Sequence, residues 1–277
     1  MPSQRPTEAV LEATRDLDRR STEEILAAIH SEDHRAWEAV GEVLPSLALA
    51  VDVLVCTLGG GGTWFNVGAG TSGRMGAIDA AEIPPTFGLA AGRVQAVVAG
   101  GPRALSRAVE GAEDNAEAGA WELRERGLSS GDAVVALSAS GQTPFTLGCL
   151  EVAHEVGARS IAVTCDPDSP LAEAAEIGIV PCVGPEVIAG STRMKGGLAQ
   201  KMVLHLLSTT VMVRLGFVSG NLMTHLIPAS EKLRRRSVHI VMSLAGVGRR
   251  EAERLLAESD GDASEAVARA LASEDSP

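Results

Sequence analysis

The sequence predicts an α/β fold in which a parallel five-stranded sheet is covered by helices on both faces. Five short apolar runs lie between residues 63 and 190, and Ala-rich amphipathic segments separate them. Strands that alternate with helices are typical of βαβ units, which build parallel sheets. The runs do not alternate between apolar and polar residues, as expected for strands that are buried on both sides. The five predicted strands are 64–67, 94–99, 133–137, 161–164 and 177–183.

Helical patterns flank the predicted sheet. Residues 7–58 are predicted to be helical, with Ser21 and Glu24 as a capping box. A second helical stretch is expected from about residue 37 to residue 58, and it ends at the four glycines 59–62. A long helix is predicted over 192–215, and residues 246–271 have the pattern of two or three short helices.

These patterns divide the chain into four predicted parts. They are an N-terminal helical segment (1–39), an α/β domain (40–220), a connecting helix (221–245) and a small helical module (246–277).

Composition narrows the classes of partner. The 277 residues carry a net charge of −12, and aromatic residues make up only 3%. An acidic chain with few aromatic residues is unsuited to nucleic acid or to an anionic membrane surface. The N-terminus lacks the apolar region of a signal peptide, and the four cysteines lie far apart. We therefore expect a cytoplasmic protein with buried free thiols and no metal.

Two loops that follow predicted strands have the composition of anion-binding sites. Residues 68–74 (GAGTSGR) follow the first strand, and residues 138–144 (SASGQTP) follow the third. Free N–H groups at the start of a helix, together with hydroxyl groups, bind anions. Ser138, Ser140 and Thr143 have a simpler explanation as ordinary helix caps. Three hydroxyls within six residues, mirrored after the first strand, favour a phosphorylated small molecule.

The first loop also matches the G-x-G-x-x-G pattern of dinucleotide-binding proteins. Such a site requires an acidic residue at the end of the second strand, where this chain has Ala99-Gly-Gly101. The chain has no P-loop motif. We therefore expect no nucleotide cofactor.

Two acidic segments, 79–85 (DAAEIPP) and 110–114 (EGAED), are candidates for acid–base chemistry. Most Asp and Glu residues are solvated at the surface. Glu82, however, lies in an otherwise apolar stretch before Pro84. If it is partly desolvated there, its pKa rises and it can serve as an acid.

Several long motifs, in the same order along the chain, resemble those of N-acetylmuramic acid 6-phosphate etherases. This family belongs to the sugar isomerase (SIS) group of phosphosugar-binding folds, and the glucokinase regulatory protein is a non-enzymatic relative. The resemblance covers nearly the whole chain and implies an SIS-type three-layer sandwich. The motifs are GAGTSGRMG (68–76), DAAEIPPTF (79–87), VEGAEDN (109–115), SASGQTP (138–144), VGPEVIAGSTRMK (183–195), GNLM (220–223) and EKL (231–233).

The resemblance implies a lyase of amino sugar metabolism that acts without a metal or organic cofactor. The family cleaves the lactyl ether at C3 of its 6-phosphorylated sugar by elimination followed by addition of water. The two catalytic glutamates of the family correspond to Glu82 and Glu113. Glu82 would protonate the leaving group and then activate water, and Glu113 would act at C2. A homodimer with sites near its interface is expected.

The resemblance also implies a set of substrate contacts. Hydroxyls of the two loops would hold the phosphate, and residues of the 183–195 motif would contact the sugar, with Lys195 offsetting negative charge. The implied residues are Thr71, Ser72, Ser138, Ser140, Gln142, Thr143, Glu186, Ser191, Thr192 and Lys195.

Three departures from the family pattern keep other functions open. The family typically has Arg at the position of Gln142 and Asn at that of Ser230, and the segment 224–228 (THLIP) differs. Arg binds a carboxylate with two hydrogen bonds and a charge that Gln lacks. If the missing Arg recognises the lactyl carboxylate, an alternative function is dehydration of N-acetylglucosamine 6-phosphate. A non-catalytic sugar-phosphate sensor is a second alternative.

Overall fold

The computed structural model describes residues 5–274. Its contacts divide the chain into two compact units, each described by itself below. The first comprises Met1–Ala80 with Val94–Ser208, and the second comprises Ala81–Arg93 with Thr209–Pro277. Two of the boundaries fall inside helices, α3 (Gly70–Phe87) and α7 (Lys195–Arg214).

The first unit contains the predicted sheet. All five predicted strands are present, and every neighbouring pair runs parallel. The order in the sheet is β2-β1-β3-β4-β5, so the chain reverses its direction of growth between β1 and β3. The strands are β1 (Trp64–Gly68), β2 (Val94–Val98), β3 (Ala133–Leu137), β4 (Arg159–Val163) and β5 (Ile177–Ile179).

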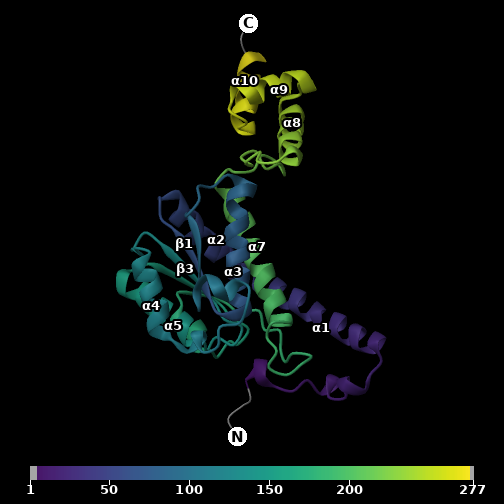
Figure 1. Ribbon diagram of the computed structural model, residues 1–277, viewed down its shortest axis with the longest axis vertical. Helices are drawn as coiled ribbons and strands as arrows, with labels where there is room; N and C mark the ends of the chain where they lie inside the picture. Colours follow the sequence, from purple (N-terminus) through teal and green to yellow (C-terminus); the bar gives the residue numbers. More distant parts are fainter. Residues whose placement is uncertain (1–4, 275–277) are drawn as a thin grey trace. The chain divides into compact units, whose positions relative to one another are not determined.

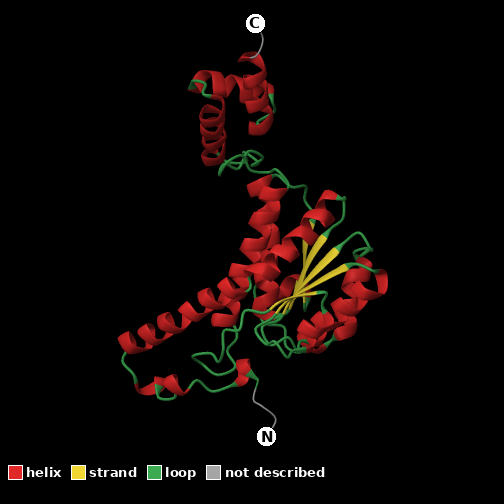
Figure 2. Cartoon of the chain, turned by 180° about the vertical axis from the view of Figure 1, so that it is seen from behind, coloured by secondary structure: helices red, strands yellow, loops and turns green. Residues whose placement is uncertain are grey.

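Helices cover both faces of this sheet, which confirms the three-layer sandwich (Figures 1 and 2). One face packs against α4 (Ala116–Glu125), α5 (Pro144–Val156) and α6 (Pro170–Ala174). Its core joins buried Phe65 and Val134 of the sheet to Leu123 and Phe145 of the helices. The other face packs against α2 (Leu44–Gly59) and α3.

The N-terminal region differs in part from the expected run of helices. Residues 6–19 form only three isolated 3₁₀ turns, Pro6–Glu8, Glu12–Thr14 and Leu17–Arg19. The first α-helix, α1 (Thr22–Glu42), begins at the predicted capping box, in which Ser21 and Glu24 each accept the other's backbone N–H. The break before α2 falls at Val43 and not near residue 37, because Pro45 favours the first turn of a new helix.

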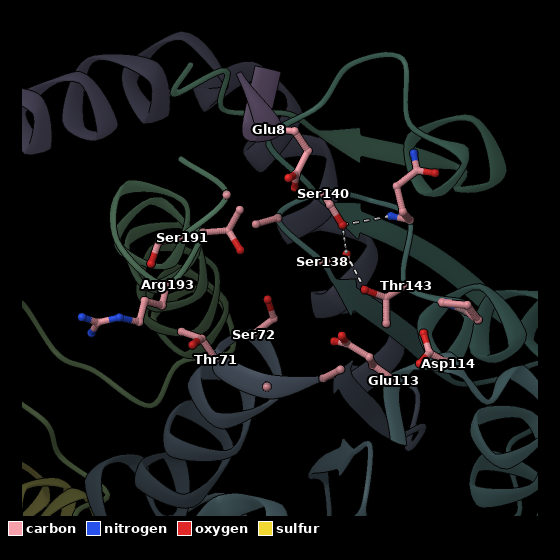
Figure 3. A pocket seen from close by; sticks show the side chains of 17 residues that line it. Glu8, Thr71, Ser72, Glu113, Asp114, Ser138, Ser140, Thr143, Ser191 and Arg193 are labelled. Atoms are coloured by element: carbon pink, nitrogen blue, oxygen red, sulfur yellow. Dashed lines mark hydrogen bonds between the residues drawn. The ribbon is translucent and has the colours of Figure 1, made fainter. Parts of the chain in front are cut away.

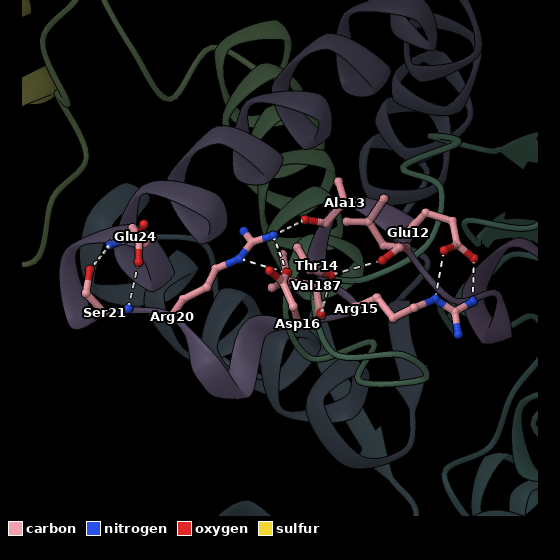
Figure 4. Close-up of polar contacts among 10 residues, drawn as sticks. Glu12, Ala13, Thr14, Arg15, Asp16, Arg20, Ser21, Glu24 and Val187 are labelled. Atoms are coloured by element: carbon pink, nitrogen blue, oxygen red, sulfur yellow. Dashed lines mark hydrogen bonds and ion pairs between the residues drawn. The ribbon is translucent and has the colours of Figure 1, made fainter.

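The 3₁₀ segment is fastened to a loop far along the chain (Figure 4). The Thr14 hydroxyl donates to the carbonyl oxygen of Val187 at 3.0 Å. Arg20 binds the Asp16 carboxylate at 2.6 Å and donates to the carbonyl of Ala13, which stabilises the turns internally. Residues near position 8 are therefore held beside the 187–190 loop.

The second unit is built around three helices, α8 (Glu231–Ala245), α9 (Arg249–Glu258) and α10 (Ala263–Glu274). They share one apolar core, to which Ile240, Leu255 and Ala266 contribute one residue from each helix. The predicted connecting helix therefore belongs to the same core as the predicted small module. Ser230 accepts the N–H of Leu233 and caps α8, a role that Asn performs equally well.

Two further expectations concern membrane-spanning helices and the cysteines. No single helix in residues 5–274 is long and apolar enough to cross a membrane, although α1 and α2, bent by 60°, meet the length and composition criteria as a pair. The four cysteines are free, as expected, but Cys56 and Cys182 are exposed and not buried.

Close packing of α3 on β1 requires glycine at position 73. A Cβ atom there would lie 2.6 Å from the carbonyl oxygen of Gly68 and 2.8 Å from a methyl group of Val98. The start of α3 is thereby pressed against the end of the strand, which fixes the loop between them.

Gly73→Ala should lower the free energy of unfolding by about 1–3 kcal/mol, because the clash is with backbone that has little room to shift. Gly41→Ala is the matched control, since an added Cβ on this exposed residue of α1 meets nothing within 4 Å. It should leave stability unchanged or raise it by up to about 1 kcal/mol. Urea unfolding followed by circular dichroism measures both, and equal stability of Gly73→Ala and the parent would contradict the packing argument.

Candidate active site

A pocket of about 490 Å³ opens at the carboxyl ends of β1 and β3 (Figure 3). This is the point at which the strand order reverses, where open parallel sheets bind their ligands. Nine of the twelve residues proposed from the sequence line this pocket: Thr71, Ser72, Glu113, Ser138, Ser140, Gln142, Thr143, Ser191 and Thr192.

The hydroxyls that follow β3 form a connected cluster (Figure 3). The Ser138 oxygen lies 2.9 Å from the Thr143 oxygen and 3.4 Å from the Ser140 oxygen. Thr143 stands at the N-cap of α5, yet its hydroxyl makes no capping bond within the described chain. Ordinary helix capping therefore does not account for Thr143. Hydroxyl groups therefore cluster at the start of α5, whereas its first residue, Pro144, has no N–H and the N–H of Thr146 already donates to the carbonyl of Thr143.

A second set of donors comes from the start of α3. Thr71 and Ser72 line the pocket in the first turn of this helix. Ser72 is buried, and its hydroxyl donates to the side-chain oxygen of Gln200 in α7 at 2.8 Å. Two helix starts with their hydroxyls thus meet at one pocket, as the spacing of the loops predicted.

Three carboxylates and one cationic side chain also line the pocket. Glu113 and Asp114 come from a 3₁₀ turn (Ala112–Asp114), and Glu8 comes from the N-terminal segment. Among the described residues that line the pocket, Arg193 alone carries a cationic side chain. Figure 3 shows Arg193 on the side opposite Glu113 and Asp114, with its guanidinium directed away from the hydroxyl cluster.

Sequence reasoning missed Glu8, Asp114 and Arg193. Asp114 and Arg193 lie inside motifs that were recognised, and their charge was the available signal. Nothing in the local sequence around Glu8 indicates its position, which depends on the packing of the N-terminal segment against the 187–190 loop.

Glu82 is not among the residues that line this pocket. It lies on α3 in the part of the chain assigned to the second unit, whereas the described pocket residues all belong to the first. Its side chain is exposed and not partly desolvated as expected, because Ile83, and not Glu82, faces the interior on this turn of the helix.

Glu186 has a structural role. Its side chain is buried, and its two carboxylate oxygens accept the backbone N–H groups of Lys195 and Gly196 at 3.0 and 2.9 Å. It therefore caps the start of α7. Burial raises the pKa of Glu186 above its ordinary value, and the two N–H groups oppose that rise. Its predicted contact with the sugar stays a prediction.

Lys195 is likewise engaged within the protein. It is fully buried, and its Nζ lies 2.5 Å from Oε2 of Glu32 in α1. Glu32 also contacts Arg35 at 3.2 Å. A carboxylate thus already neutralises Lys195, and Lys195 does not line the pocket within the described residues. Its role in offsetting the charge of the substrate stays a prediction.

Metal-ligating side chains do not cluster in this structure. Within residues 5–274, no group of three His, Cys, Asp or Glu side chains is arranged to hold a metal ion.

Comparisons with known proteins identify the family. The family models for the glucokinase regulatory protein N-terminal SIS domain and for the SIS domain match residues 48–154 and 119–210. N-acetylmuramic acid 6-phosphate etherases from Yersinia pestis (strain Pestoides F) and Yersinia pseudotuberculosis (strain IP 31758) are each 47% identical over 255 residues, covering 92% of this chain and 86% of theirs. The chain belongs to the N-acetylmuramic acid 6-phosphate etherase family.

Solved structures confirm the SIS-type fold of this etherase-family member. The phosphoheptose isomerase from Neisseria gonorrhoeae has a TM-score of 0.54 at 18% identity, covering 69% of this chain and 98% of its own. A phosphoheptose isomerase from Francisella tularensis has a TM-score of 0.52 at 20% identity, covering 70% of this chain and 99% of its own.

Lys195→Met tests whether this lysine is structural. Removing one partner of a buried ion pair leaves the other charge uncompensated, so the free energy of unfolding should fall by about 3 kcal/mol or more. Arg254→Met, which breaks exposed pairs with Glu251 and Glu258, is the control and should leave the stability close to that of the parent, because solvent screens exposed ion pairs. Unchanged stability together with a raised KM would instead assign Lys195 to substrate binding.

Proposed function

We propose that the protein cleaves the C3 lactyl ether of N-acetylmuramic acid 6-phosphate, releasing D-lactate and leaving N-acetylglucosamine 6-phosphate. The observation that carries this proposal is the similarity to curated etherases over most of the chain, combined with a pocket of hydroxyl and N–H donors at the strand-order reversal. The activity of this family member is thereby that of a carbon–oxygen lyase acting on a phosphosugar.

The phosphate is assigned to the donors of the two helix starts. Ser72, Ser138, Ser140 and Thr143 supply hydroxyls, and the first turn of α3 supplies backbone N–H groups. Neutral donors with helix dipoles bind a dianion without requiring buried lysines. Glu113 then lies on the wall that faces the sugar.

The proposed chemistry is an elimination followed by hydration. In the open-chain sugar, the C1 aldehyde acidifies the C2 proton, and a carboxylate removes it. The C2–C3 double bond forms as the C3–O bond breaks, and the departing lactate oxygen takes a proton from an acid. Water then adds its oxygen to C3 and a proton to C2. General acids and bases suffice for each step, so the proposal includes no metal or organic cofactor.

We assign these proton transfers to Glu113 and Glu82. Glu113 lines the pocket and is proposed to act at C2. Glu82 is proposed, on its place in the DAAEIPPTF motif alone, to protonate the leaving oxygen and then activate water; its carboxylate is exposed and does not line the pocket among the described residues.

The lactyl carboxylate has one candidate partner. Gln142 lines the pocket but supplies no charge, whereas Arg193 supplies the cation.

Incubation with N-acetylmuramic acid 6-phosphate, followed by mass spectrometry, should show release of lactate. Loss of water from N-acetylglucosamine 6-phosphate, with the lactyl sugar untouched, would contradict the etherase and establish a dehydratase. Binding without turnover would establish a sensor.

Glu82→Gln and Glu113→Gln should each lower kcat for lactate release by about 100-fold to 10,000-fold, because each removes a proton-transfer group. Glu125→Gln, an exposed position on α4 outside the pocket, is the matched control and should retain full activity. Full activity of either active-site variant would remove that residue from the mechanism.

We further propose that the protein forms a homodimer through α1 and α2. Three large apolar side chains on these helices are exposed in the single chain: Leu26 by 62%, Trp37 by 63% and Leu49 by 61%. Large apolar side chains that are exposed in a single chain are typical of interaction surfaces where they form a patch.

Trp37→Arg should therefore shift the sedimentation mass from dimer toward monomer, because a charged side chain at an apolar interface is poorly compensated. Trp121→Arg, at a tryptophan 56% exposed on α4, should leave the dimer intact. A monomeric parent protein, or a Trp37→Arg variant that stays dimeric, would contradict this interface.

A further inference from the structure

A buried glutamine, Gln200, is hydrogen-bonded to Ser72, a serine that lines the pocket. Gln200 lies on α7 with only 1% of its surface exposed. Its Oε1 accepts the hydroxyl proton of Ser72 at 2.8 Å. Its Nε2 is buried and has no hydrogen-bond partner among the described residues.

This orientation is unfavourable for an anionic ligand. A serine hydroxyl has a single proton to donate, and the remaining electron pairs of its oxygen only accept. When Ser72 donates to Gln200, it turns those electron pairs toward the pocket. A phosphate oxygen in contact with Ser72 would then meet an acceptor and not a donor.

The side-chain amide of Gln200 can correct this by turning over. A half-turn about its last bond exchanges Oε1 and Nε2 without moving neighbouring groups, and it breaks only the bond to Ser72. The amide then donates to the Ser72 oxygen, which releases the hydroxyl proton toward the pocket. The turn also replaces an unpartnered buried N–H with an unpartnered carbonyl, and the latter is the less unusual in native proteins.

We propose that Gln200 is a positioning residue whose amide donates to Ser72 when a phosphate occupies the pocket, so that Ser72 donates to the phosphate. This inference rests on the proposed function only in that the pocket holds a phosphosugar. It adds a residue from the middle of α7 that does not line the pocket within the described residues.

The direction in which one substitution changes the Kd for the phosphosugar tests the proposal. Gln200→Met keeps the length of the side chain and removes both hydrogen-bonding ends. If Gln200 only accepts the Ser72 proton, its loss frees that proton, and phosphosugar binding stays the same or tightens. If Gln200 donates to Ser72, its loss raises the Kd for N-acetylglucosamine 6-phosphate by about 3-fold to 10-fold, the worth of one hydrogen bond.

Calorimetric titration with N-acetylglucosamine 6-phosphate measures this Kd, and thermal melting confirms that the variant is folded. Gln200→Leu serves as a second variant if the methionine protein does not fold. In a Ser72→Ala background, Gln200→Met should have no further effect, because the coupling passes through the missing hydroxyl.

Unchanged or tighter binding by Gln200→Met overturns the proposal, as does a loss that adds in full to that of Ser72→Ala. Each of these outcomes leaves the proposed function standing. If the parent protein binds no N-acetylglucosamine 6-phosphate, the proposed function fails and the role of Gln200 fails with it.

Discussion

The reversal of strand order between β1 and β3 is the constraint on which the site depends. Because β1 pairs with β2 on one side and β3 on the other, the two loops that leave β1 and β3 emerge side by side at one edge of the sheet. Each loop opens a helix, and each loop is rich in glycine, alanine and hydroxyl residues, which let a ligand approach closely. This side-by-side arrangement of the two loops explains the hydroxyl cluster, the burial of Ser72 and the close packing at Gly73.

The buried charges in this structure serve the framework and not the ligand. Glu186 caps α7, and Lys195 pairs with Glu32 of α1, so both ends of the 187–194 loop are held from within. The pocket itself combines neutral donors, three carboxylates and Arg193. A protein of net charge −12 thereby meets an anionic phosphosugar with local dipoles, which act at short range and depend little on total charge.

The sequence was sufficient for the sheet and for the two loops, because both leave local signals. Apolar runs of strand length marked β1 to β5, and Ser138, Ser140 and Thr143 follow β3 directly. The burial and the partners of Glu186 and Lys195 could not be predicted, because both come from long-range packing. Lys195 pairs with a residue 163 positions away, and Thr14 anchors the N-terminal segment across 173 positions. Gln200 carries no local signal, since it is one of several polar residues along α7 and its burial is set by tertiary packing.

The central claim is that the phosphate of an amino sugar binds at the meeting point of α3 and α5. A crystal structure of the protein soaked with N-acetylglucosamine 6-phosphate tests it most directly. The account predicts phosphate oxygens within hydrogen-bond distance of Ser72, Ser138, Ser140 and Thr143, with the sugar ring directed toward Glu113. A phosphate bound elsewhere, or a sugar ring occupying the hydroxyl cluster with its phosphate toward solvent, would contradict the account.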